Sequence, residues 1–305
     1  MSFFLAVDAG GTKTDFVLAD ETRQLARVRT GTIKRLRTDE ATTSANLDQG
    51  LSELTAQIGI ALSDVTLTCI GTAGEQVPLV ADWLRESFRT RVGGELILLG
   101  DVEIALDAAF PGDSGILVLA GTGSNVAGRS SRGAMVSTGG WGPVLAEQGS
   151  GYRIGLEALR AMFLGIDECE STLLQSAILD FWQLESIEAL VAYANSLPAP
   201  DFSRLTPAVL ECANRGDVIA QRVLRQQGVE LAHLVCLVIR RLQAANQPDW
   251  APAIAFAGSI MENIPPVRDA LATVVLHQFP NVRMLDGVVD PVTGAIWRAR
   301  CFAAK

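Results

Sequence analysis

The sequence predicts an α/β protein built from two domains. Apolar runs of strand length alternate with amphipathic helical segments along most of the 305 residues. A strand, a glycine-rich turn and a second strand occur near the N-terminus, and the same device recurs from residue 115. A chain of 305 residues also exceeds the length at which one hydrophobic core usually stops growing.

The elements of the first half follow a strand-rich order that closes near residue 112. Leu47, Leu51 and Leu54 recur at helical spacing, which indicates an amphipathic helix after the first strands. The expected elements are strands 3–7, 15–20 and 25–33, helix 41–60, strand 65–70, helix 80–88, strand 95–99 and helix 102–110.

The second half restarts with the strand–turn–strand device at 115–129 and continues mainly as helices. We expect helices at 151–164, 171–182, 186–197, 204–214 and 217–244, then a strand at 252–257, a helix at 265–279, a strand at 281–285 and a helix at 292–304. The recurrence of one device in both halves indicates an internal duplication.

Composition excludes several classes of protein. The chain is 49% hydrophobic and 19% charged, which is typical of a folded protein, and its net charge of −9 argues against nucleic acid as a partner. The longest apolar run, 234–239, is far shorter than a membrane span. Five scattered cysteines and two isolated histidines favour neither a disulfide framework nor a metal cage. We therefore expect a cytoplasmic enzyme without a membrane partner.

The segment DAGGTKT at 8–14 is the strongest local motif. Gly10 and Gly11 allow the backbone to approach an anion, and successive N–H groups of such a turn form a nest for phosphate oxygens. Thr12 adds a hydroxyl and Lys13 a positive charge, while Asp8 is placed to hold Mg²⁺, usually through water. An ordinary glycine hairpin is the alternative. The motif therefore predicts a phosphate site, with Mg²⁺ beside it.

A second candidate nest is AGTGSN at 120–125. When the sequences of the two preceding strands are aligned, Gly121, Thr122 and Gly123 fall at the positions of Gly10, Gly11 and Thr12 in the first turn. Alone the motif is weak, but paired with the first turn it predicts a second contact to the same nucleotide.

Asp101 is the candidate catalytic base. It follows the strand ELILLG and begins a helix, which places its side chain at the carboxyl edge of a sheet, where ligand sites of α/β proteins open. Phosphoryl transfer needs an acceptor for the hydroxyl proton, and neither histidine lies near a loop motif. A purely structural helix N-cap is the alternative.

In combination, DAGGTKT, AGTGSN, GGWG and EQGSG resemble the N-acetylglucosamine kinases and BadF/BadG-type ATPases of the sugar-kinase/Hsp70/actin superfamily, and also the bacterial glucosamine kinases. The resemblance implies a two-lobed, actin-like ATPase fold of ribonuclease H-like lobes, with nucleotide and sugar in the cleft. It implies an N-terminal lobe at 1–112, a C-terminal lobe at 113–291 and a final helix, 292–305, that packs back on the first lobe.

The resemblance also implies roles for individual residues. Asp101 is the base and touches the sugar, and Asp8 lies near Mg²⁺. The terminal phosphates of ATP contact both glycine turns, and Gly258 and Ser259 lie on the adenosine side. The sugar contacts are Gly140, Trp141 and Glu147.

Two stretches depart from the family pattern. Glu147 and Gln148 replace an expected Asp-Glu pair, which leaves the identity of the sugar open. The 30–38 loop carries Lys34, Arg35 and Arg37 where relatives place an asparagine, so it is either a solvated edge or an anion contact. Trp141 is either a sugar contact or part of the core.

The resulting prediction is an ATP- and Mg²⁺-dependent kinase of an amino sugar that acts on its 6-hydroxyl. N-acetylglucosamine is the expected substrate and glucosamine the alternative, and the chain is expected to form a homodimer. A different class, the BadF/BadG-type activator ATPase of a dehydratase or reductase, needs paired cysteines for an iron–sulfur cluster, and the scattered cysteines disfavour it.

Overall fold

The computed structural model describes residues 2–245 and 251–303. By its internal packing the chain divides into two compact units. Unit 1 contains residues 2–117, 127–135 and 289–303, and unit 2 contains residues 118–126 and 136–288. The last two residues of the predicted helix 292–305 lie outside the described residues.

Unit 1 is built on a five-stranded mixed sheet with the order β3-β2-β1-β4-β5. β1 pairs with β2 in antiparallel and with β4 in parallel orientation, and β4 pairs with β5 in parallel. The carboxyl ends of β1, β4 and β5 therefore meet at one edge of the sheet. The strands are β1 (Phe3–Ala9), β2 (Lys13–Ala19), β3 (Gln24–Gly31), β4 (Val65–Thr72) and β5 (Glu95–Leu99).

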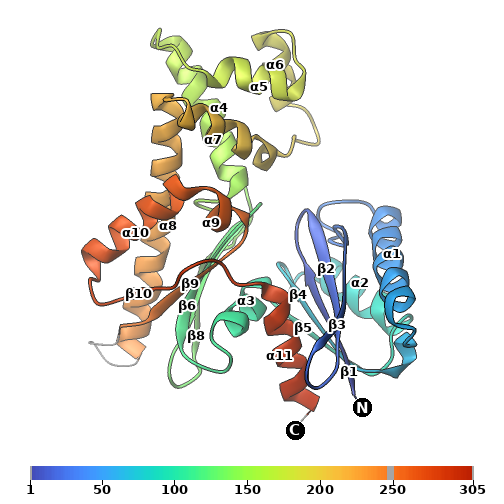
Figure 1. Ribbon diagram of the computed structural model, residues 1–305. Coiled ribbons are helices and arrows are strands. Elements are labelled where there is room, and N and C mark those ends of the chain that lie inside the picture. Colours follow the sequence, from blue (N-terminus) through green and yellow to red (C-terminus); the bar gives the residue numbers. More distant parts are fainter. Residues whose placement is uncertain (1, 246–250, 304–305) are drawn as a thin grey trace. The chain divides into compact units, whose positions relative to one another are not determined.

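Helices cover both faces of this sheet (Figure 1). On one face, α1 (Glu40–Ile58) and α2 (Pro78–Arg89) bury leucine and valine side chains of their apolar sides against β1, β2 and β4. On the other face, α3 (Asp101–Ala109) and α11 (Pro291–Ala303) pack on the alternate side chains of the same strands. A single 3-10 turn, η1 (Leu62–Asp64), leads into β4.

The second sheet has the order β10-β9-β6-β7-β8, with β9 and β10 parallel. Its strands are β6 (Gly115–Ala120), β7 (Ser124–Arg129), β8 (Met135–Gly139), β9 (Ala253–Ala257) and β10 (Arg283–Met284). Numbered from its own first strand, this order is the order of the first sheet. The shared order supports the duplication that the repeated device indicates, and the predicted α/β fold of two mixed sheets is confirmed.

Unit 2 is mainly helical outside the sheet (Figure 1). α8 is its longest helix and packs against α4, α7 and α10. The helices are α4 (Gly151–Asp167), α5 (Leu174–Trp182), α6 (Ile187–Ala194), α7 (Thr206–Asn214), α8 (Val218–Ala245), α9 (Ser259–Asn263) and α10 (Pro265–Gln278), with a 3-10 turn, η2, at Phe202–Leu205.

Two elements were not predicted, β8 and α9. β8 has the sequence MVSTG, which lacks a long apolar run and ends at a glycine, so only its pairing in the sheet makes it a strand. α9 has five residues and is too short to show a helical period. The predicted strand 281–285 is shorter than expected, at two residues.

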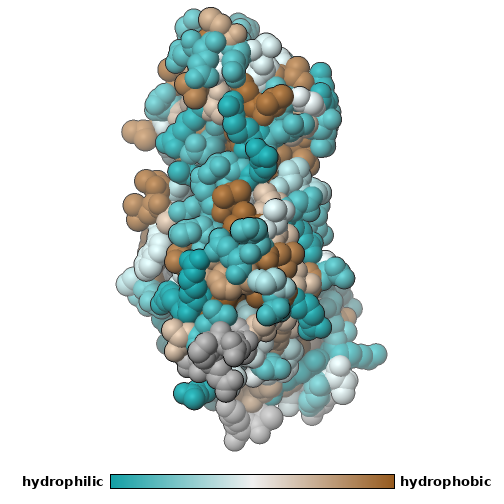
Figure 2. Space-filling view, turned by 90° about the vertical axis from the view of Figure 1, so that its left-hand side faces the viewer, coloured by the Kyte–Doolittle hydropathy of each residue, from teal (hydrophilic) through white to brown (hydrophobic). Residues whose placement is uncertain are grey.

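On the face that Figure 2 displays, hydrophobic residues are interspersed with hydrophilic ones. Among the helices of residues 2–245 and 251–303, none combines the length and the hydropathy that crossing a bilayer requires.

Candidate active site

The first glycine turn connects β1 to β2 and is held by neighbouring loops. A Cβ added to Gly10 would lie 2.9 Å from the carbonyl oxygen of Lys13, so the turn closes tightly on itself. The Thr32 hydroxyl donates to the Gly10 carbonyl (2.7 Å), and the Thr72 hydroxyl donates to the Ala9 carbonyl (3.1 Å). The turn is therefore not an isolated hairpin, because Thr32, directly after β3, and Thr72, at the end of β4, hold its backbone.

The tip of this turn is accessible. Gly10 and Gly11 are half-buried, while the side chains of Thr12 and Lys13 are exposed to solvent. The backbone of the turn is held by the two hydrogen bonds above, and its tip presents a hydroxyl and an ammonium group to solvent. This arrangement suits the binding of phosphate.

Asp8 lies at the carboxyl end of β1, opposite Asp15 in the β1–β2 register. Burial is the main cause that raises the pKa of Asp8 from 3.8 to about 7, and repulsion by Asp101, Asp15 and Asp290 adds to it. Lys13 acts in the opposite direction and lowers this pKa. Asp8 therefore lies in a group of carboxylates whose repulsion Lys13 offsets only in part.

Two arginines organise the carboxylates behind Asp8. Asp15 is 4% exposed and accepts from Arg27 Nε and Arg29 Nε, each at 3.0 Å. Arg27 also pairs with Asp290, which directly precedes α11. Sequence reasoning missed Asp290, because the partners are 263 residues apart in the chain.

The donor set around Asp8 fits a Mg²⁺ ion. Carboxylate oxygens are ligands that Mg²⁺ prefers, and a cation would relieve the mutual repulsion of Asp8 and Asp101. Over the described ranges, no group of three or more His, Cys, Asp or Glu side chains forms a metal cage. This agrees with Mg²⁺, which usually takes one or two carboxylates together with waters and substrate phosphates.

Replacement of Asp8 by asparagine is expected to stabilise the ligand-free protein at alkaline pH. Because the pKa of Asp8 is about 7 in the folded state and 3.8 in the unfolded chain, its stabilising contribution is complete below about pH 4 and is lost as pH rises through 7. Asp8→Asn should melt above the wild type at pH 8, with a gap that shrinks steadily toward pH 5. Thermal melts of Asp64→Asn, an exposed carboxylate, serve as the control. Equal melts of Asp8→Asn and wild type at every pH would contradict the prediction.

Asp101 is the first residue of α3, at the carboxyl end of β5. The N-cap position is Gly100, which makes no side-chain cap bond, and Asp101 Oδ1 accepts from the next amide, Val102 N–H (2.8 Å). Within the described residues, no other residue donates to Oδ2. The N-cap alternative is therefore wrong in position, and one oxygen of Asp101 remains for another donor.

Two groups that the sequence did not assign to the site act on Asp101. Burial raises the pKa of Asp101, the charge of Lys34 lowers it, and the carboxylate of Glu75 raises it further. Glu75 follows β4, whose carboxyl end lies beside that of β5. The position of the GTAGEQ segment directly after a parallel strand is the signal that could have identified it. Of the 30–38 loop, Lys34 is close enough to influence Asp101, whereas Arg35 pairs with Glu40 (3.1 Å).

The second glycine turn belongs to unit 2 and is fastened to the start of α4. Gly121 N–H donates to the Gly123 carbonyl (2.8 Å), which closes the turn. The Gly121 and Thr122 carbonyls accept from Gly151 N–H (2.8 Å) and Tyr152 N–H (3.2 Å). Because the carbonyls are bound to α4, the turn is fixed from behind.

The predicted adenosine-side residues pack directly on this turn. Gly258 has φ +90° and ψ 158°, a conformation that is essentially restricted to glycine. A Cβ at this position would lie 2.3 Å from the Ala120 carbonyl oxygen, and a Cβ at Gly121 would lie 3.8 Å from Ser259 Oγ. The structure thus brings Gly121, Gly258 and Ser259 together, as a common nucleotide contact requires.

Substitution of Gly258 by alanine is expected to raise the KM for ATP at least about tenfold, because the methyl group must displace the end of β6 and the glycine turn after it. The matched control is Gly287→Ala. Gly287 also has a positive φ (69°), but a Cβ there meets nothing within 4 Å. Steady-state kinetics with varied ATP measure the effect. The expectation is wrong if the two variants share one KM.

The glycine-rich segment after β8 exposes its aromatic residue. Gly140 has φ +72°, and a Cβ there would lie 2.6 Å from Asn125 Nδ2, so the loop lies against β7. Asn125 is itself held by the Ser137 hydroxyl (2.8 Å). Trp141 is 74% exposed, so its interpretation as a core residue is wrong. An exposed indole in a rigidly held loop suits contact with the C–H face of a sugar.

Glu147 and Gln148 follow in the same loop and face the second glycine turn. A Cβ at Gly123 would lie 2.9 Å from Glu147 Oε1, and the Ser124 hydroxyl donates to the Gln148 carbonyl (2.7 Å). Gln148 Oε1 is buried and has no hydrogen-bond partner among the described residues. Such an acceptor is open to a donor from outside the described residues.

Relatives of known description cover the whole chain. It is 29% identical to an N-acetylmuramic acid/N-acetylglucosamine kinase of Clostridium acetobutylicum over 98% of this chain and 99% of the relative. It is 27% identical to the N-acetyl-D-glucosamine kinase of Dictyostelium discoideum over 96% of both chains. The alignments leave no large segment of either relative without a counterpart here.

Solved structures show the same fold. A candidate N-acetylglucosamine kinase of Chromobacterium violaceum superposes with a TM-score of 0.76 at 26% identity, over 97% of this chain and 98% of that one. A glucokinase of the ROK family from Streptomyces griseus, solved with glucose and AMPPNP, has a TM-score of 0.59 at 17% identity and covers 98% and 100% of the two chains. The family resemblance predicted from the four motifs is confirmed, since residues 5–299 match the BadF/BadG/BcrA/BcrD ATPase family, to which this chain belongs.

Proposed function

We propose that the protein is an ATP-dependent kinase that transfers a phosphoryl group to the 6-hydroxyl of an amino sugar, with N-acetylglucosamine as the substrate. The observation that carries the proposal is the full-length likeness to two kinases named for N-acetylglucosamine. The accessible first turn, the half-buried Asp101 and the exposed Trp141 support it, because they supply the three kinds of contact that such a reaction needs.

In this proposal the sugar hydroxyl gives its proton to Asp101. The raised pKa of Asp101 makes its carboxylate a better proton acceptor than an ordinary one, and the nearby charge of Lys34 acts in the opposite direction and lowers this pKa. The terminal phosphates of ATP contact the backbone at Gly10 and Gly11 with Thr12 and Lys13. Asp8 holds Mg²⁺, and the ion neutralises phosphate charge when it is bound.

The residues of unit 2 complete the assignment. Gly121, Thr122 and Gly123 contact phosphate through a turn that α4 holds in place, and Gly258 and Ser259 contact the nucleoside side. Gly140 shapes the loop that presents Trp141 to the sugar ring. Glu147 and the unpartnered Gln148 Oε1 accept hydrogen bonds from its polar groups.

A coupled ADP-release assay with N-acetylglucosamine, glucosamine, glucose and N-acetylmannosamine tests the proposal. We expect Mg²⁺-dependent turnover with N-acetylglucosamine to exceed that with the other sugars. Higher turnover with glucosamine would favour glucosamine kinase, the alternative. Turnover without any sugar, together with iron in the purified protein, would instead favour the activator ATPase. A dehydratase component of Acidaminococcus fermentans shares the fold at 12% identity, and at this identity the likeness concerns the fold alone.

An acid-substituted sugar is a second candidate substrate. Lys34 places a positive charge beside Asp101, and N-acetylmuramic acid, which the Clostridium acetobutylicum relative is named for, carries a carboxylate on its 3-oxygen. If Lys34 contacts this group, Lys34→Gln should raise the KM for N-acetylmuramic acid at least about tenfold and leave the KM for N-acetylglucosamine within about threefold. Equal effects on the KM values of both sugars would show that Lys34 acts on Asp101 and not on the carboxylate of the sugar.

We also propose a cytoplasmic homodimer. All five cysteines are free thiols, which suits a reducing compartment. Unit 2 exposes large apolar side chains, including Leu164 (54%), Val218 (71%) and Leu197 (95%), that an association of two chains can cover. Light scattering coupled to gel filtration should give twice the 32.5 kDa mass of the chain.

A further inference from the structure

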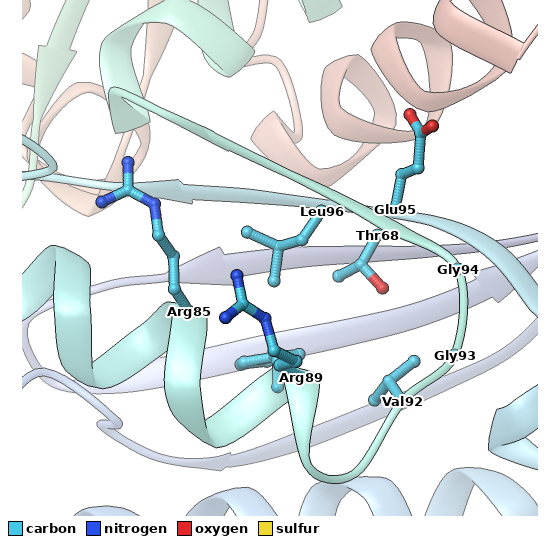
Figure 3. Close-up of a pocket in the computed structure, with 9 residues that line it drawn as sticks. Thr68, Arg85, Arg89, Val92, Gly93, Gly94, Glu95 and Leu96 are labelled. Atoms are coloured by element: carbon cyan, nitrogen blue, oxygen red, sulfur yellow. The ribbon is translucent and has the colours of Figure 1, made fainter.

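A cavity of about 620 Å³ opens in unit 1 on the side of the sheet that α1 and α2 cover. It lies between the second half of α2 and the strands β4 and β5 (Figure 3). We call it the α2 pocket; its lining residues are Thr68, Arg85, Phe88, Arg89, Val92, Gly93, Gly94, Glu95 and Leu96.

The α2 pocket is separate from the candidate active site. Its residues Gly93 to Leu96 lead into the amino end of β5, whereas Asp101 follows the carboxyl end of the same strand. At about 3.3 Å per residue, the length of β5 puts its two ends about 13 Å apart. No role in the proposed phosphoryl transfer uses a residue of this pocket.

Two arginines on one face of α2 reach over the cavity. Arg85 and Arg89 are four residues apart in the helix, and their guanidinium groups extend in the same direction in Figure 3. Among residues 2–245 and 251–303, the ion-pair partner of Arg85 is Asp82, at 3.8 Å and with both side chains more than half exposed. Arg89 has no ion pair within the described part of the chain. Like charges at this spacing repel each other, so an anion bound by both would stabilise the pair.

Thr68 is an independent sign of a ligand. It lies in the middle of β4, is 1% exposed and lines the pocket (Figure 3). Its hydroxyl has no hydrogen-bond partner among the described residues. A buried hydroxyl without a partner costs about 1–3 kcal/mol, so its presence in the wall of a cavity points to a polar group inside.

The remaining walls are mainly apolar. Phe88, Val92 and Leu96 supply this surface. The carboxylate of Glu95 points away from α2 in Figure 3, because side chains alternate along β5 and Leu96 faces the pocket. Two cations and a hydroxyl beside an apolar wall match a molecule with an anionic group, a hydroxyl and C–H surface. An inorganic anion alone would leave Thr68 unused.

We propose that the α2 pocket binds a small phosphorylated polyol of the size of a hexose phosphate. Its phosphate pairs with Arg85 and Arg89, and one hydroxyl bonds to Thr68 Oγ1. Its C–H groups lie on Phe88 and Leu96. The cavity volume of about 620 Å³ lies in the range of about 300–1,000 Å³ that is usual for small-molecule sites.

Equilibrium dialysis of the full chain with the catalytic site occupied tests the proposal. Saturating N-acetylglucosamine and a non-hydrolysable ATP analogue block that site, and the probes are labelled N-acetylglucosamine 6-phosphate, glucosamine 6-phosphate and inorganic phosphate. We expect one equivalent of a sugar phosphate to bind, and inorganic phosphate to bind at least about tenfold more weakly. No saturable binding of either sugar phosphate, or equal binding of inorganic phosphate, would overturn the proposal.

Variants assign the binding to these residues. Arg85→Ala/Arg89→Ala should weaken sugar phosphate binding at least about tenfold, and Thr68→Val about fivefold, with melting temperatures no lower than that of the wild type. The control Arg23→Ala/Arg132→Ala removes the same charge from exposed positions of unit 1 and should leave binding unchanged. Equal losses in both double variants would overturn the assignment. Arg85→Ala/Arg89→Ala should keep the wild-type rate of ADP release, so failure of the kinase proposal and failure of this one are separate results.

Discussion

Asp101→Asn is expected to lower kcat at least about 100-fold while the KM for the sugar stays within about threefold. Asparagine keeps the size of the side chain and can still accept from the Val102 N–H, so the start of α3 should be preserved. What it loses is the ability to take the proton of the attacking hydroxyl. The defect should therefore appear in turnover rather than in binding.

The matched control for this variant is Asp113→Asn. Asp113 also accepts from the next amide, Ser114 N–H (2.7 Å), but it lies in an exposed turn. Coupled ADP release with saturating ATP measures both variants, and a melt checks that both are folded. If Asp101→Asn keeps more than about a tenth of the wild-type kcat, Asp101 is not the base.

Asp107→Asn is expected to lower the free energy of unfolding of unit 1 by about 3–5 kcal/mol. Asp107 is fully buried and accepts from Arg129 Nη1 (2.7 Å) and Arg298 Nε (2.8 Å). An asparagine leaves the Arg129 guanidinium without this counter-charge, leaves Arg298 with only the longer contact to Glu103 (3.5 Å), and turns an N–H donor toward one of the two arginines. The three residues come from β7, α3 and α11, so the loss loosens all three elements.

Calorimetric or urea-induced unfolding measures this effect, and Asp48→Asn provides the comparison. Asp48 pairs with Arg91 at 2.6 Å, but its side chain is 59% exposed, so its replacement should cost about 0–1 kcal/mol. A loss for Asp107→Asn no greater than that for Asp48→Asn would show that the buried pairs contribute little.

Local patterns were sufficient to predict most of the fold. The β1–β2 turn and the start of α3 depend on neighbours in the sequence, so the positions of Gly10 and Asp101 in the fold could be predicted. β8 could not, because its five residues become a strand through partners elsewhere in the sheet. α9 could not be predicted because its five residues are too few to show a helical period.

The environment of the site depends on long-range packing and was less predictable. The raised pKa of Asp8 results mainly from burial and further from carboxylates that three different segments bring to it, and only its proximity to the glycine turn was visible in the sequence. Glu147 lies against Gly123 because the loop after β8 folds back. Trp141 illustrates the limit most clearly: composition favours burial for tryptophan, and only the fold shows its exposure.

The position of α11 has a consequence for how the protein is made. A Cβ at Gly294 would lie 1.8 Å from the Ile104 carbonyl oxygen, so α11 fits against α3 in near backbone contact, and it covers the apolar face that β1 and β4 present. During translation this face is complete after residue 72, but its cover is the helix Pro291–Ala303. The part of this face that α11 covers therefore stays exposed while more than two thirds of the chain is synthesised. Chaperones that hold exposed apolar surface have their longest opportunity to act in that interval.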